Sequence, residues 1–292
     1  MATRHGALLG EVGDYPTWSW PIAMALSPIS ASRHVVEFSM RSQARVVGLW
    51  QHHDQLIWWQ SGLPSFGANV VLNCGLQPDL LACGRLARLM AWGSCPVGWM
   101  VWPDQQPQRQ KSVLIGAGFQ HHQTIALLSR PSADLSQSPS GALICALDPG
   151  HQRGFAEFLK VCHQLPPGLA GVVSQAFLQG ESRGKSDQQF CTFAVMEAGA
   201  PIASITACVL PGFADTIGGL LWLGTHPSFR RQGLARDLTS RACAWLAQHG
   251  AVRVFVQAAA PAEPLYRQLA FQQDGVLELW TLEPIRCRLN ES

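Results

Sequence analysis

The chain has 292 residues, of which 47% are hydrophobic and 14% are charged, so it is long enough for two packed domains and too apolar to be disordered. Its 21 Lys and Arg residues nearly balance its 19 Asp and Glu residues, and the formal charge is +2. Because a protein that neutralises many phosphates needs a basic surface, this balance argues against nucleic acid as a partner.

The nine cysteines form no C-x-x-C pair, which is typical of reduced, buried thiols in a reducing compartment and predicts no zinc site. Residues 1–16 contain no apolar segment of the signal-peptide kind, and no apolar run approaches the ~18 residues of a membrane span. We therefore expect a cytoplasmic protein, a monomer or homodimer, that binds neither a metal nor a membrane.

In the first half of the chain, the pattern predicts a helix from Asp79 to Trp92, a strand at 97–102 and a short helix at 108–115. Residues 129–141 have the weakest periodicity, and their Ser, Pro, Asp and Gly residues are typical of an exposed connection. We place a domain boundary there, with one domain over residues 1–135 and another over residues 136–292.

In the second half, the pattern predicts a mixed sheet with helices packed on it. Strands are expected at 142–147, 190–197, 202–210, 217–224, 252–256 and 276–282, and helices at 155–162, 234–249 and 263–269. The break at Pro166-Pro167-Gly168 is expected to end the first of these helices.

Two segments of the chain resemble each other and suggest an internal repeat. When Phe119 is aligned with Phe271, residues 118–128 match residues 270–280 in pattern, with Ile125 over Leu277. The same offset places Leu114 where the second copy has Tyr266.

Residues 223–235 join a predicted strand to the helix that begins at Leu234. A tight turn there leaves backbone N–H groups unpaired, and the helix dipole adds ~0.3–2 kcal/mol of attraction for an anion. Arg230 and Arg231 can add charge-assisted hydrogen bonds, while Gly233 and the small Ala235 permit close approach. The segment therefore predicts a pyrophosphate site.

Residues 230–235, Arg-Arg-Gln-Gly-Leu-Ala, resemble the [Q/R]-x-x-G-x-[G/A] coenzyme A loop of GNAT superfamily N-acetyltransferases. Residues 265–271, Leu-Tyr-Arg-Gln-Leu-Ala-Phe, are similar to the family's Y-x-x-L-G-F motif. The resemblance covers about residues 142–284, and the first half resembles the degenerate N-terminal part of tandem GNAT proteins in residues 63–71 and at Gly118-Phe119. It implies an α/β (α+β) fold, with a GNAT-like mixed central sheet flanked by helices, in two tandem domains.

The resemblance also implies acetyl-CoA as cosubstrate and a role for each matching residue. The residues that would bind the coenzyme are Leu223, Thr225, Arg230, Arg231, Gln232, Gly233, Leu234 and Ala235. An N–H of Leu223 or its neighbour would face the thioester oxygen, and Tyr266 would be the general acid that protonates the departing thiolate. The first domain lacks the loop and is expected to bind no coenzyme.

The chain departs from the family pattern at three places, one of which is Ala258-Ala259-Ala260, where family members often have Ser or Asn to contact the coenzyme. Ala270 replaces a glycine, at a cost of roughly 1–2 kcal/mol if the turn needs a positive φ. The strand 218–224 contains no carboxylate to act as general base, so Asp215, Glu181, His226 or an ordered water are the candidates. Trp222 is either a wall of the acceptor site or ordinary sheet packing.

These observations predict an acetyl-CoA-dependent N-acetyltransferase that moves the acetyl group directly to a primary amine. Direct transfer is favoured because no Cys or Ser lies in a recognisable nucleophile arrangement, although Cys208 stays a candidate. A small molecule, such as an amino sugar or an aminoglycoside-like amine, is favoured over a protein N-terminus or lysine because a second domain can close over it. The alternatives are a non-catalytic acyl-CoA-binding regulatory protein and a structural two-domain scaffold.

Overall fold

The computed structural model describes residues 27–53, 56–73, 75, 79–91, 95–132, 142–179, 190–211 and 215–284. Within these ranges, no helix is long and apolar enough to cross a membrane. The predicted domain boundary after residue 135 lies outside the described residues, and so does Glu181.

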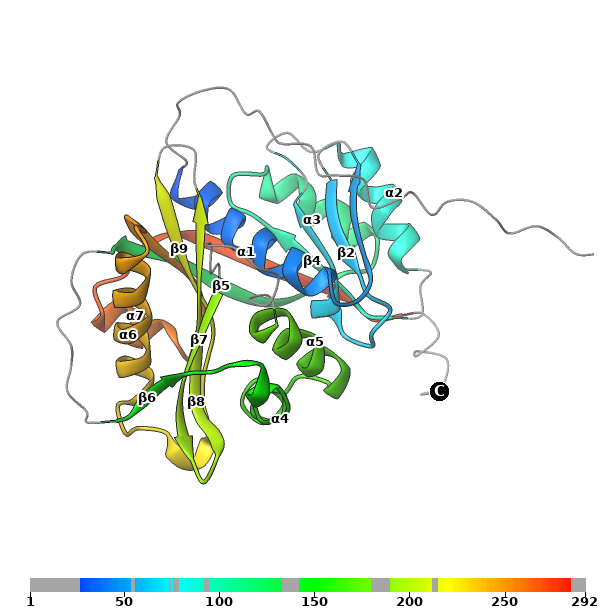
Figure 1. Cartoon of the computed structure of the whole chain (residues 1–292). Coiled ribbons are helices and arrows are strands. Elements are labelled where there is room, and N and C mark those ends of the chain that lie inside the picture. Colours follow the sequence, from blue (N-terminus) through cyan, green and yellow to red (C-terminus); the bar gives the residue numbers. More distant parts are fainter. Residues whose placement is uncertain are drawn as a thin grey trace, which may run out of the picture.

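Eleven strands of the described chain form one continuous mixed sheet (Figure 1). They are β1(Leu49–His53), β2(Leu56–Gln60), β3(Asn69–Asn73), β4(Val97–Val101), β5(Gln120–Pro131), β6(Ile144–Ala146), β7(Phe190–Glu197), β8(Ala200–Pro211), β9(Thr216–Thr225), β10(Arg253–Ala259) and β11(Gln272–Leu282). Their order across the sheet is β1-β2-β3-β4-β11-β5-β10-β9-β8-β7-β6. The pairs β3–β4 and β9–β10 are parallel, and the other neighbours are antiparallel.

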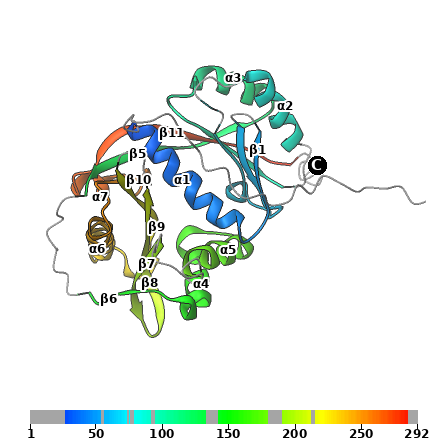
Figure 2. The same cartoon turned by 45° about the horizontal axis from the view of Figure 1, so that its top comes forward.

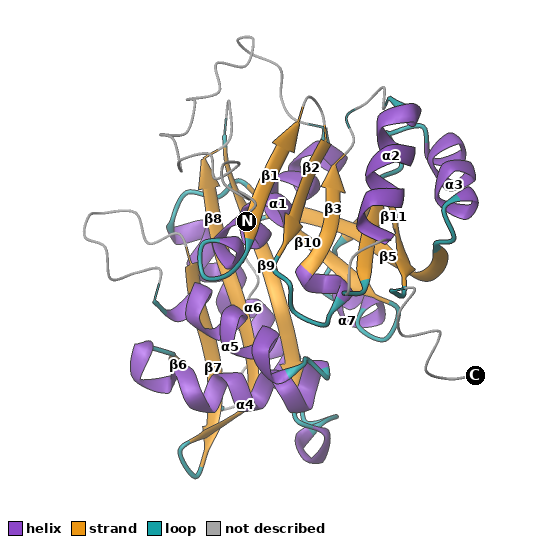
Figure 3. Ribbon diagram, turned by 90° about the vertical axis from the view of Figure 1, so that its right-hand side faces the viewer, coloured by secondary structure: helices purple, strands orange, loops and turns teal. Residues whose placement is uncertain are grey.

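The helices pack on the sheet in three groups, each with its own apolar core. They are α1(Pro28–Ala44), α2(Leu80–Ala91), α3(Pro107–Gly116), α4(Gln152–His163), α5(Pro167–Leu178), α6(Leu234–Gln248) and α7(Glu263–Gln268). Helices α1, α4 and α5 share one core, α6 and α7 share a second, and α2 and α3 cover the strands of the first half (Figure 2). Figure 3 shows α4 and α5 in front of strands β7–β9 and α6 behind them. The expectation of a mixed α/β sheet flanked by helices is confirmed.

The two halves of the chain exchange their last strands. Strand β5 of the first half lies between β10 and β11, and β11 of the second half lies between β4 and β5. In the antiparallel pairing of β5 with β11, Ile125 lies opposite Leu277, the residue with which the repeat aligns it. An approximate two-fold axis of the repeat therefore passes between these two strands.

The turns that precede the exchanged strands are alike in detail. The N–H of Phe119 donates to the Leu114 carbonyl at 3.0 Å, and the N–H of Phe271 donates to the Tyr266 carbonyl at 3.0 Å. The residue before each Phe has a left-handed backbone, with φ of 89° at Gly118 and 61° at Ala270. The structure thus places Leu114 and Tyr266 at equivalent positions.

The structure corrects one feature predicted from the sequence and contains several elements that the pattern did not predict. The break at Pro166–Gly168 follows the end of α4 as predicted, but it also begins α5, a second helix, because proline is well tolerated in the first turn of a helix. Residues 129–131 belong to β5 rather than to a connection, and Ser129 is buried where its Oγ accepts from Nε of Arg253 at 2.9 Å. The sequence pattern also failed to indicate α1, β1, β2 and β3.

Candidate active site

The parallel strands β9 and β10 pair along part of their length and then separate. Their pairing runs from Ile217 opposite Arg253 to Leu220 opposite Val256 and goes no further, although β10 continues to pair with β5 as far as Ala259. Beyond Leu220 the sheet is therefore open between two strands whose outer neighbours stay in place.

A bulge in β9 lies beside this opening. Ser204 of β8 pairs with Gly224 and Thr206 pairs with Leu221, so Trp222 and Leu223 lie opposite the single residue Ile205. Trp222 has a φ of 52°, which is strained for a residue with a side chain. A bulge takes residues out of the regular ladder, and it re-aims their backbone and side chains beside the opening.

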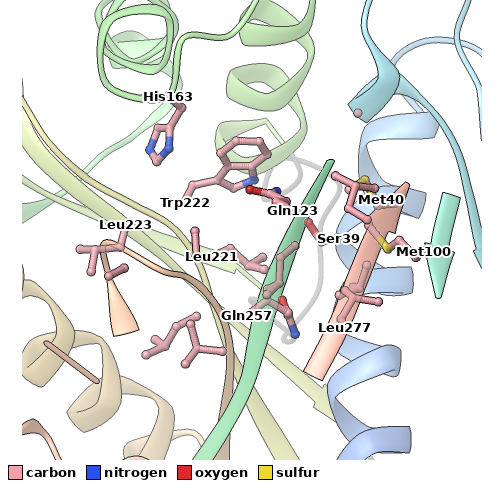
Figure 4. Close-up of a pocket in the computed structure, with 18 of the residues that line it drawn as sticks. Ser39, Met40, Met100, Gln123, His163, Leu221, Trp222, Leu223, Gln257 and Leu277 are labelled. Carbon is pink, nitrogen blue, oxygen red and sulfur yellow. The ribbon is translucent and has the colours of Figure 1, made fainter. Parts of the chain in front are cut away.

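A cavity of about 390 Å³ passes through the opening in the sheet (Figure 4). Its described lining comes from both halves of the chain: Val36, Ser39, Met40, Phe66, Gly67, Val70, Met100, Gln123, Ile125, His163, Leu220, Leu221, Trp222, Leu223, Val256, Gln257, Ala259, Ala262, Tyr266, Leu277 and Leu279. Leu220, Val256 and Tyr266 belong to the core under α6 and α7, whereas Leu277 and Leu279 belong to the core under α1, α4 and α5. The cavity therefore connects the two faces of the sheet.

Tyr266 lines the cavity from the short helix α7 and is only 2% exposed. Its ring meets the edge of Phe271, with centroids 5.3 Å apart. Burial raises the pKa of the phenol above its usual value, and the neighbouring Cys243 thiol raises it further. The phenol is therefore protonated at neutral pH and can donate a hydrogen bond or a proton into the cavity.

The loop that follows β9 ends at the N-terminus of α6. Arg231 and Gly233 both have left-handed backbones, with φ of 66° and 84°. The first helical donors are the N–H groups of Arg236 and Asp237, which both donate to the Gly233 carbonyl. Within the described part of the chain, the N–H groups of residues 233–235 have no acceptor, and Gly233 supplies no side-chain cap. Such a helix start can bind an anion through its N–H groups and its dipole.

The arginines of this loop differ in their contacts. Arg230 is exposed, and its Nε donates to the Thr225 carbonyl at 3.2 Å, so this side chain turns back along the loop. Arg231 and Gln232 are also exposed. The loop therefore offers cationic side chains at the rim of the helix start.

Of the three side chains considered as general base, Asp215 and His226 do not line the cavity, and Glu181 is not described. Asp215 is exposed and precedes β9, whereas Trp222 lies near the other end of that strand, about 20 Å along an extended chain. Asp215 is not among the described residues that line the cavity, so its role as general base stays a prediction without support from this geometry. His226 caps the turn after β9, where its Nδ1 accepts from the Ser228 N–H at 3.4 Å.

The sequence also suggested Trp222 as a wall of the acceptor site and Cys208 as a nucleophile. Trp222 lines the cavity and is half-buried, so it forms part of a wall. Cys208 is fully buried and does not line the cavity, and burial raises the pKa of its thiol to about 12. A thiol of this kind is a poor nucleophile. The described residues also include no cluster of three His, Cys, Asp or Glu side chains that could hold a metal.

His163 also lines the cavity, and no sequence pattern indicates it. It is the last residue of α4, one position beyond the predicted helix, and no motif surrounds it. Its ring is perpendicular to that of Trp222, with centroids 5.3 Å apart (Figure 4). Burial lowers the pKa of His163 to about 4, and a hydrogen bond to the Trp222 backbone opposes this shift only in part. The imidazole is therefore neutral at neutral pH.

Comparisons with known proteins agree with this geometry. The sequence profile of the acetyltransferase (GNAT) family matches residues 174–271, from α5 to the turn after Tyr266. No curated protein sequence matches the chain. Residues 174–271 therefore belong to a GNAT-family acetyltransferase domain.

Solved structures resemble the chain over most of its length. A GCN5-related N-acetyltransferase from Kribbella flavida has a TM-score of 0.60 at 14% identity, covering 86% of this chain and 95% of its own. A Drosophila protein has a TM-score of 0.57 at 15% identity, covering 87% and 90%. A Staphylococcus epidermidis protein of unknown function has a TM-score of 0.55 at 12% identity, covering 82% and 95%. At these identities the likeness concerns the fold alone.

Proposed function

We propose that the protein is an N-acetyltransferase that moves the acetyl group of acetyl-CoA directly to a primary amine of a small molecule. The observation that carries this proposal is the cavity through the opened sheet, with the protonated phenol of Tyr266 in its wall. The start of α6, with N–H groups that have no acceptor in the described chain, supports a diphosphate-bearing cosubstrate.

In this proposal, the loop and the opened strands hold the coenzyme, whose contribution is an activated acetyl thioester. The backbone of Leu223 and Thr225 binds the pantetheine arm, and residues 230–235 bind the pyrophosphate. A backbone N–H at the β9 bulge stabilises negative charge on the carbonyl oxygen, an effect worth a few kcal/mol in other enzymes. Tyr266 protonates the leaving sulfur.

We further propose that residues 136–292 form the coenzyme-binding domain and that residues 1–135 are a degenerate GNAT-like domain without coenzyme. Support comes from Trp102, a fully buried residue that follows β4. Its indole N–H donates to the Leu72 carbonyl of β3 at 2.7 Å. This side chain bridges β3 and β4 just beyond their last parallel pair, Val71 with Trp99, where the second half is open between β9 and β10.

The test combines coenzyme binding with catalysis. We expect acetyl-CoA to bind in calorimetry and thiol release to require an added amine. Tyr266→Phe removes the acid but keeps the ring beside Phe271, so kcat falls by about 100-fold while the Kd of acetyl-CoA stays within about twofold.

The outcomes separate the alternatives. An unchanged kcat in Tyr266→Phe would remove the phenol from the role of acid. Tight binding without thiol release from any amine would favour the non-catalytic regulatory protein, for which the lack of a carboxylate in the described cavity lining is the supporting observation. No binding of acetyl-CoA would contradict the proposal as a whole.

A further inference from the structure

The cavity extends beyond the opening, on the face of the sheet that α1, α4 and α5 cover. Its walls there are mainly apolar: Val36, Met40, Phe66 and Met100 come from the first half of the chain, and Leu277 and Leu279 come from β11. The phenol of Tyr266 reaches the cavity from the opposite face. A coenzyme held by the loop before α6 would leave this part of the cavity to the acceptor. We refer to it as the acceptor subsite.

The described lining of the cavity carries no formal charge. It contains no Asp, Glu, Lys or Arg, and its polar side chains are Ser39, Gln123, His163, Gln257 and Tyr266. The amide nitrogen of Gln257 is already engaged, because it donates to Oγ of Ser32 at 2.9 Å. An ammonium group enclosed here would lose its hydration without meeting an opposite charge, which is unfavourable. The subsite therefore disfavours acceptors with several ammonium groups.

One polar atom in the subsite has no partner. Nε2 of His163 is buried and makes no hydrogen bond within the described chain. Its position depends on Gly224, since a Cβ at that residue would lie 2.7 Å from this nitrogen. A neutral imidazole has one acceptor nitrogen, and a buried acceptor without a donor is costly. The ring lines the cavity, and a small rotation that opens Nε2 to it would let an N–H group of a ligand satisfy this atom.

We propose that the acceptor subsite takes a primary monoamine with an apolar body, whose amino group donates a hydrogen bond to Nε2 of His163. The inference rests on the proposed function and narrows its acceptor away from amino sugars and aminoglycosides. The cavity volume of about 390 Å³, which also includes the opening, is near the lower end for small-molecule sites and suits a compact ligand.

The test compares octylamine with 1,8-diaminooctane, which has the same length and a second amino group. Calorimetry on the protein without coenzyme, at about pH 9 to increase the neutral fraction of each amine, gives both dissociation constants. We expect octylamine to bind at least about tenfold more tightly than the diamine. Met40→Glu places a carboxylate in the subsite and is expected to reduce that preference by about tenfold.

Two further variants complete the design. Leu89→Glu makes a comparable change on α2 at a residue that is 71% exposed and outside the cavity, so the preference should stay that of the wild type. His163→Leu removes the acceptor nitrogen and should raise the dissociation constant of octylamine by about tenfold. His163→Gln keeps an acceptor oxygen and should restore part of the lost affinity.

The inference is wrong if the diamine or glucosamine binds the wild type as tightly as octylamine does, or if Met40→Glu leaves the preference unchanged. Failure of the proposed function has a different signature. In that case octylamine binds as expected, but acetyl-CoA does not bind in the parallel titration.

Discussion

Tyr266 and His163 line the same cavity, and burial keeps both of them neutral. A medium of low dielectric disfavours the charged form of any group, so the pKa of the phenol rises and that of the imidazole falls to about 4. In the proposed reaction, the first residue is therefore a proton donor and the second is a hydrogen-bond acceptor. Burial is thus the common cause that suits the phenol to donating a proton and the imidazole to accepting a hydrogen bond.

The lowered pKa of His163 predicts a pH dependence of stability. In the unfolded chain the imidazole has a pKa near 6.5, so between about pH 6.5 and 4 the unfolded state binds more protons than the folded state. The free energy of unfolding should therefore decrease as the pH falls through this range. His163→Gln does not titrate, and its loss of stability over the same range should be smaller. Urea denaturation at pH 7 and pH 5 measures both losses.

The groups beside His163 named below do not titrate between pH 7 and pH 5, so the change in stability can be assigned to its imidazole. Its ring meets Phe158 and Trp222 edge to face, neither of which titrates. Cys162 beside it has a pKa raised to about 11 by burial, well above the tested range, and Arg230 opposes that shift. Equal losses of stability in the wild type and His163→Gln would show that the imidazole is free to become charged in the folded protein.

The turn between α7 and β11 is strained at Ala270, the residue that stands where the GNAT motif has a glycine. Ala270 has a φ of 61° and is exposed, so its methyl group is strained and contributes no buried contact. Ala270→Gly relieves roughly 1–2 kcal/mol of strain and loses about 0.4–1 kcal/mol through the greater freedom of the unfolded chain. The free energy of unfolding should rise by about 0.5–1 kcal/mol.

Thermal and urea unfolding at one pH measure this change. The equivalent turn of the first half supplies the control, because Gly118 has a φ of 89° and Gly118→Ala should destabilise the protein. If Ala270→Gly lowers stability instead, the turn is not strained in the way its backbone indicates.

Local patterns in the sequence predicted much of the second half of the fold. The helix that begins at Leu234 and the strands around it follow from apolar periodicity, and the glycine-containing loop marks the start of that helix. Helix α5 was not predicted, because Pro166-Pro167-Gly168 is typical of a segment that interrupts helical structure. The bulge at Trp222 also has no sequence signal, since a left-handed Trp is unusual.

The site itself was predictable only where a motif covers it. Tyr266 and the loop at 230–235 lie in short contiguous motifs, whereas His163 reaches the cavity from the end of a helix through tertiary packing. The same holds for Met40 and Met100, which lie far from the motifs in sequence. Contacts of this range depend on how the two halves are joined, and periodicity within a single segment does not carry that information.

The exchange of strands makes each half of the molecule incomplete without the other. The second half, which we propose binds the coenzyme, receives β5 from the first half, and Gln123 and Ile125 of that strand line the cavity. In return, β11 completes the sheet of the first half through its pairing with β4. The internal repeat in the sequence indicated two similar units, but it could not show that their last strands are exchanged.

Arg130 links this exchange to the site, because it lies on β5 and contacts the segment that carries Tyr266. Its Nη1 donates to the Leu269 carbonyl at 2.6 Å, and its guanidinium lies 5.8 Å from the ring centre of Phe271. Arg130→Met keeps most of the volume but leaves that buried carbonyl without this donor. We expect the free energy of unfolding to fall by about 1–3 kcal/mol and kcat to fall by about tenfold as the phenol moves.

Arg253→Met is the matched control. Arg253 also links the two halves, since its Nε donates to Oγ of Ser129, but it contacts β5 rather than the turn after α7. Its loss should lower stability without changing kcat, measured at saturating acetyl-CoA well below the unfolding midpoint. If both variants reduce kcat equally, β5 supports the site only through the general stability of the sheet. If Arg130→Met alone reduces it, a residue of the first half positions the acid of the second, and the exchanged strand is part of the catalytic apparatus.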